Sequence, residues 1–166
     1  MLVGIGTVLA DDPALTVREV RGRDPLRVVV DTDARTPPTA KVVRARDPQR
    51  TVIFVARDAD ARRVKRLRDA GALVTSLPRS EAGLDLGAVL HWLAEQGVNT
   101  VLCEAGPTIA SRLVSSRLAD RLMLITAPLA GGDGPSALDG LAPAIDVRSL
   151  RVRRLGDDVA MEGEIG

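Results

Sequence analysis

The sequence has very little of three residue types on which many functional sites depend: cysteine, histidine and the aromatics. Its 166 residues contain one cysteine, Cys103, and one histidine, His91. A single cysteine excludes an internal disulfide, and together with one histidine it is too little for a zinc site of the usual cysteine and histidine kind. We therefore expect a reducing, cytoplasmic location and no metal site.

Aromatic residues make up 1% of the chain, and net charge is nearly absent. Phe54 and Trp92 cannot form the stacking platform on which single-stranded nucleic acids bind. The 23 Lys and Arg residues are balanced by 22 Asp and Glu, so no global field attracts nucleic acid or an anionic membrane. No apolar run reaches the length of a membrane span, and the first residues do not have the pattern of a signal peptide. Neither nucleic acid nor membrane is an expected partner.

The chain also lacks the short motifs of common nucleotide-binding and acyl-transfer sites. Residues 4–9, GIGTVL, resemble the start of a dinucleotide-binding fingerprint, but Leu9 stands where the third glycine belongs. No G-x-x-x-x-G-K-[ST] loop and no G-x-S-x-G elbow occurs. His91 falls inside a predicted helix, which is a poor place for a catalytic triad. The sequence instead favours a site at which a bound cofactor does the chemistry.

What is present is an alternation of apolar strands and amphipathic helices typical of an α/β protein. Strands are predicted at 26–31, 51–56 and 72–78, and helices at 58–71 and 85–97. Residues 150–165 predict a hairpin turning at Gly156-Asp157-Asp158, an antiparallel edge on an otherwise parallel sheet. The arginines of 58–71 are interpreted as a solvated helix face, and Trp92 and His91 as a packing residue and a surface residue.

The segment GIGTVLADDPALTVR, residues 4–18, follows an apolar stub that predicts the tail of a strand. We expect it to form a polar loop at the carboxyl end of that strand, where open α/β sheets bind ligands. Asp12 is interpreted as a structural residue of the turn before Pro13.

A second informative segment is NTVLCEAGPTIASRLV, which predicts a strand over 100–103, a turn, and a helix with Pro107 in its first turn. The backbone N–H groups of Gly106, Thr108 and Ile109 would then form a seat for phosphate. An equally open alternative is that Ala105-Gly106 only permits a tight turn. A strand and a glycine-rich loop follow within 121–136.

Three strings, VGIGTVLADDPALTVR, RVVVDTDART and VLCEAGPTIASRLV, in this order and spacing resemble the reductase domain of bacterial riboflavin biosynthesis, which is usually fused behind a zinc deaminase. The resemblance implies a dihydrofolate-reductase-like fold, with a mostly parallel central sheet, flanking helices and a C-terminal antiparallel hairpin. It also implies NADPH-dependent reduction of 5-amino-6-(5-phosphoribosylamino)uracil by a homodimer. Residues 1–166 would be one reductase-type domain without the first strand and helix of the family, and without deaminase motifs.

Carried over residue by residue, the resemblance assigns roles to positions of this chain. Substrate would contact Leu15, Arg18 and Glu104, with Arg18 pairing with the ribose phosphate. NADPH would contact Thr7, Asp11, Thr32, Gly106, Pro107, Thr108, Ile109, Ala110, Ser111 and Arg112. No general acid is identified.

Two alternatives and one further candidate residue stay open at this stage. The chain could be a non-catalytic nucleotide-binding or assembly module of the same fold, or a reductase of another pterin-like or flavin-like substrate. Arg57 follows a predicted strand end, and this position makes it a candidate for the 2′-phosphate of NADPH.

Overall fold

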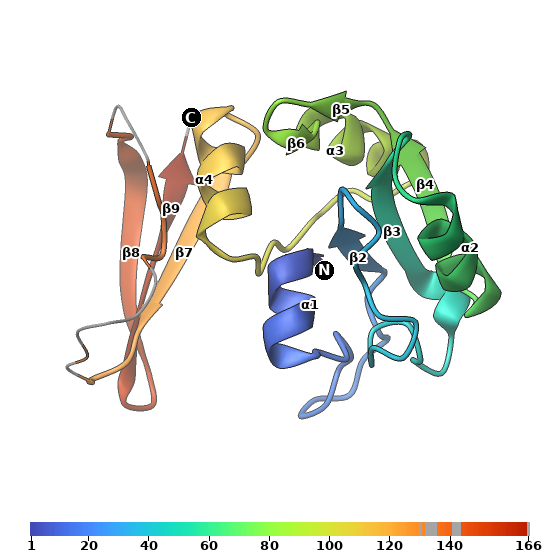
Figure 1. Ribbon diagram of the computed structural model, residues 1–166. Helices are drawn as coiled ribbons and strands as arrows, with labels where there is room; N and C mark the ends of the chain where they lie inside the picture. Colours follow the sequence, from blue (N-terminus) through green and yellow to red (C-terminus); the bar gives the residue numbers. More distant parts are fainter. Residues whose placement is uncertain (130, 132–135, 141–143, 166) are drawn as a thin grey trace. The chain divides into compact units, whose positions relative to one another are not determined.

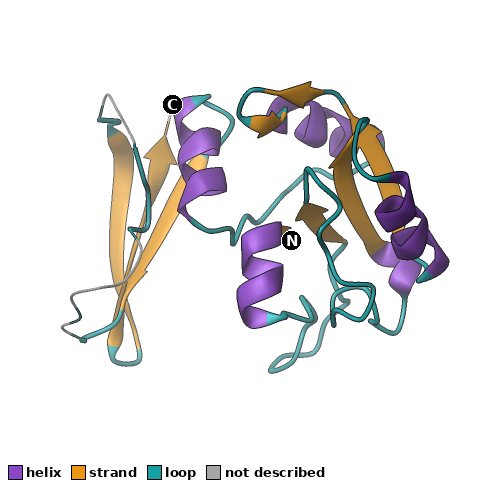
Figure 2. Cartoon of the chain, in the orientation of Figure 1, coloured by secondary structure: helices purple, strands orange, loops and turns teal. Residues whose placement is uncertain are grey.

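The computed structural model describes residues 1–129, 131, 136–140 and 144–165. The chain forms two compact units, Met1–Gly106 and Pro107–Gly166, and each is described here by itself. Figure 1 labels their helices and strands, and Figure 2 colours them by type. That the two units act as one reductase-type domain remains a prediction.

The first unit is built on a parallel sheet of order β1-β2-β3-β4, as the alternating pattern predicted. Its strands are β1 (Leu2–Gly4), β2 (Arg27–Val30), β3 (Thr51–Ala56) and β4 (Leu73–Leu77). Its helices are α1 (Ile5–Asp11), η1 (Pro48–Arg50), α2 (Ala61–Asp69) and α3 (Leu86–Glu95), and a small ribbon joins β5 (Arg79–Ser80) to β6 (Gly83–Leu84). β2 and β3 are buried along their whole length, as parallel strands covered on both faces are.

Side chains alternate between the two faces of this sheet and meet different helices. On one face, Ile53 and Val55 belong to a buried cluster that includes Val8 of α1 and Leu67 of α2. On the other face, the ring of Phe54 packs edge-on against Trp92 of α3, with ring centroids 5.3 Å apart. The packing role predicted for Trp92 is confirmed. His91 is exposed and lies 3.4 Å from the Glu95 carboxylate, which confirms its surface position.

The opening segment is a helix rather than the expected loop. Residues 5–11 form α1 because Val8 gains burial in the core, which outweighs the weak helix propensity of the glycine and the β-branched residues there. The helix ends at Asp12, which adopts left-handed backbone (φ 43°) before Pro13. Asp12 is structural, as expected, but its Oδ1 accepts the N–H of Lys41 (2.8 Å) and thereby ties α1 to a distant loop.

The strand predicted over 100–103 is reduced to a single parallel bridge between Leu2 and Cys103. The Leu2 N–H donates to Leu102 O (2.8 Å), and the Glu104 N–H donates to Leu2 O (3.0 Å). Two bonds are too few for a regular strand, but they fix residues 102–104 alongside β1.

The second unit contains α4 (Pro107–Ser115), β7 (Arg121–Thr126), β8 (Val147–Leu155) and β9 (Asp158–Ile165). The hairpin β8-β9 is confirmed, with Gly156 in left-handed conformation (φ 64°) at its turn. Within the described residues β9 pairs with β7, in the order β7-β9-β8, so the hairpin extends an antiparallel sheet and not an edge of the parallel one. Residues 132–134 of the expected glycine-rich loop lie outside the described residues.

Candidate functional site

The candidate residues of the first unit gather along the carboxyl edge of the parallel sheet. The Ala56 N–H donates to Thr32 O, and the Arg57 N–H donates to Leu77 O, both at 2.9 Å, so the ends of β2, β3 and β4 lie in a row. Glu104 continues this row beyond β1, because its backbone pairs with Leu2. Residues that are distant in sequence therefore share the edge at which α/β sheets bind ligands.

The first turn of α1 begins at this edge and contains polar groups that are available to a ligand. Gly4 caps the helix without any side-chain bond, and the first turn contains no acidic residue. Thr7 is half-buried there. A Cβ added to Gly6 would meet no atom within 4 Å, so nothing inside the chain requires glycine at that position. The open surface above Gly6 leaves room for a bound molecule.

Asp31 fixes the loop that follows β2. It is fully buried, and its Oδ2 accepts both the N–H (2.6 Å) and the hydroxyl (2.7 Å) of Thr36. The Ala34 N–H donates to Asp31 O (3.2 Å), which closes a turn with Ala34 in left-handed conformation (φ 53°). Asp31 Oδ1 is buried without a partner. The carboxylate thus holds residues 32–36 in one conformation and positions Thr32 at the edge.

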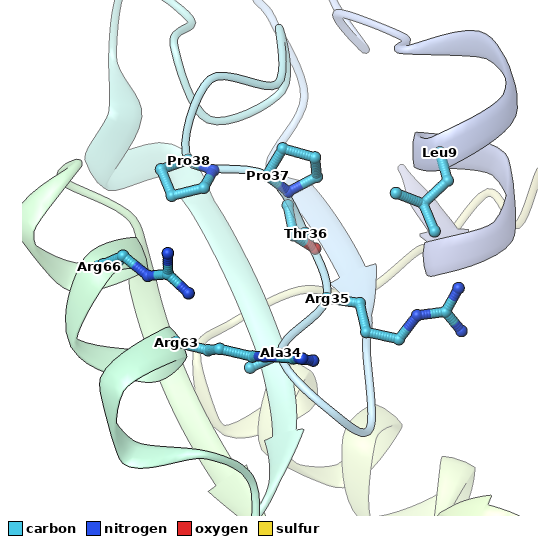
Figure 3. A pocket seen from close by; sticks show the side chains of 8 residues that line it. All are labelled: Leu9, Ala34, Arg35, Thr36, Pro37, Pro38, Arg63 and Arg66. Atoms are coloured by element: carbon cyan, nitrogen blue, oxygen red, sulfur yellow. The ribbon is translucent and has the colours of Figure 1, made fainter.

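A surface cavity of about 450 Å³ opens beside this loop (Figure 3). Its lining combines apolar groups with three arginines and no carboxylate: Leu9, Ala34, Arg35, Thr36, Pro37, Pro38, Arg63 and Arg66. Arg63 and Arg66 belong to α2, whose arginines were predicted to form a solvated face. They are exposed, as predicted, but they also share this cavity with Arg35.

Asp11 is the last residue of α1 and Thr7 is in its first turn, while Leu15 and Arg18 lie in the segment that follows the helix. Asp11 and Arg18 are exposed. Leu15 is 9% exposed and belongs to the core cluster, with left-handed backbone (φ 52°). The loop carrying Arg18 is closed by a bond from the Val17 N–H to Asp24 Oδ1 (2.8 Å). Their contacts with substrate and cofactor remain predictions.

Residues 102–104, which pair with β1, bring the ionisable side chains of Cys103 and Glu104 near the carboxyl edge of the sheet. Glu104 is exposed. Burial raises the pKa of the Cys103 thiol, so this cysteine stays protonated at neutral pH and is a poor nucleophile. Among the described residues no cluster of three His, Cys, Asp or Glu side chains suits a metal ion.

In the second unit, α4 begins at Pro107, directly after Gly106, as predicted. The φ of Gly106 is not left-handed, so a glycine-dependent turn does not explain this residue. No acceptor among the described residues takes the N–H groups of Thr108 and Ile109, as expected in a first helical turn. Ser111 is buried and its Oγ accepts the Asp139 N–H (2.7 Å), while Ala110 and Arg112 are half-buried. None of the described helices is long and apolar enough to cross a membrane.

Sequence reasoning missed Asp31 and the arginine-lined cavity. The pattern D-x-x-x-x-T after a strand, here Asp31 and Thr36, is a usable signal for a carboxylate that closes a loop. The cavity had no such signal, because Arg35 follows β2 whereas Arg63 and Arg66 lie on α2 after β3, and only the packing of α2 beside the loop after β2 brings them together.

A parallel sheet with helices on both faces, a separate antiparallel hairpin sheet and a polar carboxyl edge define an α/β protein of the dihydrofolate-reductase-like class. Comparison with known proteins then identifies the family. The family model of the RibD C-terminal domain matches residues 1–161 of the sequence. The chain therefore belongs to this family. It is thus a reductase of riboflavin biosynthesis, which confirms the predicted class of enzyme and fold.

Relatives of two lengths match the chain. It is 35% identical to the 2,5-diamino-6-ribosylamino-4(3H)-pyrimidinone 5′-phosphate reductase of Archaeoglobus fulgidus, over 97% of the chain and 77% of that protein. The protein of the same name from Methanothermobacter thermautotrophicus is 37% identical, over 98% and 77%. Riboflavin biosynthesis protein RibD of Escherichia coli is 32% identical, over 97% of the chain but only 47% of its own length.

Solved structures show the same fold. Acinetobacter baumannii RibD superimposes with a TM-score of 0.81 at 25% identity, over 99% of the chain and 46% of that structure. The riboflavin biosynthesis reductase Rib7 of Saccharomyces cerevisiae also gives a TM-score of 0.81, at 17% identity, over 99% and 74%. The chain thus spans about half the length of the RibD proteins it matches.

Proposed function

We propose that this chain reduces 5-amino-6-(5-phosphoribosylamino)uracil to its 5-phosphoribitylamino counterpart, with NADPH as the reductant. The observation that carries the proposal is the pairing of residues 102–104 with β1, which sets Glu104 beside the strand that leads into α1. Family membership over residues 1–161 supports the class of reaction. The names of the relatives as reductases disfavour the alternative of a non-catalytic module.

The carboxyl edge has the chemistry that a dinucleotide requires. The hydroxyl groups of Thr7 and Thr32 would hydrogen-bond its ribose and phosphate groups, and the open surface at Gly6 leaves space for it. In the second unit, taken by itself, the free N–H groups at the start of α4 would suit a phosphate group. When bound, NADPH supplies the hydride that is added to C1′ of the opened ribose. The residues of the chain contribute binding and orientation.

Glu104 and Arg18 would hold the two ends of the substrate. Glu104 lies beside β1, which leads into the first turn of α1, and Arg18 lies in the segment that follows the last turn; the seven residues of α1 rise about 10 Å. A phosphorylated ribosylaminopyrimidine is elongated, so its ring would hydrogen-bond the Glu104 carboxylate while its phosphate pairs with the Arg18 guanidinium. Fixing both ends orients C1′, and orientation of this kind contributes up to about 7–11 kcal/mol to lowering a barrier.

A second candidate substrate is 2,5-diamino-6-ribosylamino-4(3H)-pyrimidinone 5′-phosphate. Two archaeal relatives that are 35% and 37% identical carry its name, and the chain spans 77% of each. This pyrimidine keeps an amino group where the uracil has an oxygen, and the ribose phosphate is shared. The two substrates therefore differ only at the ring end, near Glu104 in our proposal.

The test is NADPH oxidation by the purified chain with each pyrimidine in turn. We expect turnover of at least one, and the ratio of the two kcat/KM values identifies the substrate. Turnover of neither, with intact NADPH binding, would favour the non-catalytic module.

Arg18→Ala tests the assignment of the phosphate. Loss of a charge-assisted hydrogen bond should raise KM at least about tenfold and leave the NADPH Kd nearly unchanged. Arg21→Ala, an exposed arginine of the same loop, is the matched control and should leave KM as it is. An equal loss of cofactor affinity in the Arg18 variant would show that its assigned role is wrong.

Two further expectations accompany this function. A homodimer is expected from the resemblance, and the reducing cytoplasm from the cysteine count. Sedimentation of the purified chain tests the first of these.

A further inference from the structure

The segment that carries Arg18 is held by very few bonds. Residues 13–23 lie between α1 and β2 and form neither helix nor strand (Figure 1). Among the residues that the structure describes, this segment takes part in one hydrogen bond, from the Val17 N–H to Asp24 Oδ1 (2.8 Å). A segment with so few bonds opens at little cost in free energy unless both of its ends are fixed.

The start of this segment is fixed by the core. Leu15 belongs to the hydrophobic cluster and has left-handed backbone (φ 52°). Asp12, just before the segment, is also left-handed (φ 43°), and its Oδ1 accepts the Lys41 N–H (2.8 Å). Residues other than glycine keep this conformation only where their surroundings enforce it. The chain is therefore held in one conformation up to Leu15, and Arg18 follows shortly after.

The end of the segment is fixed at the entry to β2. The backbone oxygen of Asp24 accepts a hydrogen bond from Arg50 Nη2 (3.0 Å), and the buried strand β2 begins shortly afterwards at Arg27. The side chain of Asp24 is half-buried and turns back to hold Val17, the residue directly before Arg18. The fixed entry to β2 is thus connected to the backbone beside Arg18 through this one side chain.

The Arg18 side chain is available to an anion. It is exposed and has no hydrogen-bond or ion-pair partner among the described residues. Binding a phosphate must order both this long side chain and the backbone that carries it, and that ordering opposes binding. A backbone that is already fixed lowers this cost. The Asp24 carboxylate would repel a phosphate, so its effect on binding acts through Val17 and not by contact.

We propose that Asp24 is a positioning residue for the substrate phosphate, because its hydrogen bond to Val17 holds the backbone of Arg18 in the conformation that binds this group. The inference rests on the proposed function for the pairing of Arg18 with the phosphate. It goes beyond that function in naming a residue that determines phosphate affinity without touching the substrate.

A competing role for Asp24 is to balance the charge of the buried Arg27. Burial lowers the pKa of the Arg27 guanidinium, and the negative charges of Asp24 and Asp47 act against that shift. Three variants separate the two roles. Asp24→Ala removes both the acceptor and the charge, whereas Asp24→Asn removes the charge and keeps an oxygen that accepts the Val17 N–H. Asp47→Ala removes the other carboxylate near Arg27 and leaves the Arg18 segment untouched.

The experiment measures binding by calorimetry in the presence of saturating NADP⁺, so that no reduction takes place. The probes are the tighter-binding of the two pyrimidine 5′-phosphates named above and the same compound without its phosphate. In Asp24→Ala, the Kd of the phosphorylated compound should rise at least about fivefold, since one hydrogen bond to a charged acceptor is lost. The Kd values of the dephosphorylated compound and of NADP⁺ should stay within about twofold, which also shows that the variant folds.

Asp24→Asn and Asp47→Ala are the controls, and both should leave the Kd of the phosphorylated compound within about twofold. The double variant R18A/D24A tests the route of the effect. Because Asp24 acts through Arg18, this variant should bind the phosphorylated compound as Arg18→Ala alone does. Hydrogen exchange at the backbone amides of Val17 and Arg18 should become faster in Asp24→Ala and not in Asp24→Asn. An unchanged Kd in Asp24→Ala, or an equal rise in Asp24→Asn, would overturn the proposal.

The outcomes also separate this inference from the proposed function. Binding that depends on the phosphate, on Arg18 and on Asp24, without reduction of either pyrimidine, would support the positioning role and contradict the reductase. Reduction by a wild-type chain that binds the phosphorylated and dephosphorylated compounds equally well would leave the reductase in place and overturn the role of Asp24. A further rise of the Kd from Arg18→Ala to R18A/D24A would likewise overturn it.

Discussion

The two compact units bury their apolar residues to very different extents. In Met1–Gly106, β3 is buried throughout and has a hydrophobic cluster on one face and α3 on the other. In Pro107–Gly166, β8 is exposed along its length and β7 nearly so, with large side chains such as Ile125 at 54% exposure. The comparison teaches that the first unit contains most of the core that the described residues form, and it also contains the carboxyl edge.

Removing the ring of Phe54 should have the largest effect on this contrast. Phe54→Ala deletes a fully buried side chain and its contact with Trp92, so we expect a loss of about 3–5 kcal/mol in the free energy of unfolding of the first unit. Urea unfolding followed by the fluorescence of Trp92, the single tryptophan, measures it.

The matched control for this truncation lies in the second unit. Ile125→Ala removes an exposed apolar side chain and should change stability by at most about 0.5 kcal/mol. Similar losses for both variants would contradict the contrast, because Ile125 would then be as well covered as Phe54.

A smaller effect is expected at Gly163, where the backbone of the second unit leaves no room for a Cβ. A Cβ there would lie 2.8 Å from Arg148 O and would also collide with Val147, at the bulge where β8 shifts register. Gly163→Ala should therefore cost about 1–3 kcal/mol and loosen the β8-β9 pairing. Amide hydrogen exchange measures the loosening. Unchanged hydrogen exchange along β8 and β9 in the variant would contradict this prediction.

The smallest effect concerns the first turn of α2. The Asp60 carboxylate accepts the N–H groups of Arg62 and Arg63, and these bonds lower its pKa below the usual range. A carboxylate with a lowered folded pKa stabilises the fold above its unfolded pKa, and that stabilisation is lost as pH falls through the folded pKa. As the pH is lowered, hydrogen exchange at the backbone amides of Arg62 and Arg63 should become faster than the intrinsic pH dependence of amide exchange alone predicts.

Asp60→Asn is the control for this acid effect. Asparagine also caps a helix but does not titrate, so the extra acceleration should disappear in this variant. Acceleration of the same size in both chains would show that the Asp60 carboxylate is not its cause.

Local pattern was enough to predict the four strands of the first unit's parallel sheet and α2 and α3, because apolar runs and capping aspartates act within a few residues. It failed for residues 5–11, where the burial of Val8 against the sheet outweighs a polar, glycine-containing sequence. It also overestimated the strand at 100–103, whose pairing depends on Leu2 far away in the chain.

The candidate site was predictable only in part, for the same physical reason. Motif resemblance gave Thr7, Thr32 and Glu104, and the structure places all three along one sheet edge. It gave no sign that a helix, α1, separates Arg18 from Thr7 along the chain. The cavity lined by Arg35, Arg63 and Arg66 was out of reach, because it depends on how the segment between β2 and β3 packs against α2.

The most direct test of the central claim, that the carboxyl edge of the parallel sheet binds the cofactor, is an NMR titration of the isotope-labelled chain with NADP⁺. We predict that amide shifts concentrate at Gly6, Thr7 and Thr32. Shifts confined to the opposite edge, around Asp24 and Asp47 at the entry to β2 and β3, would contradict the account.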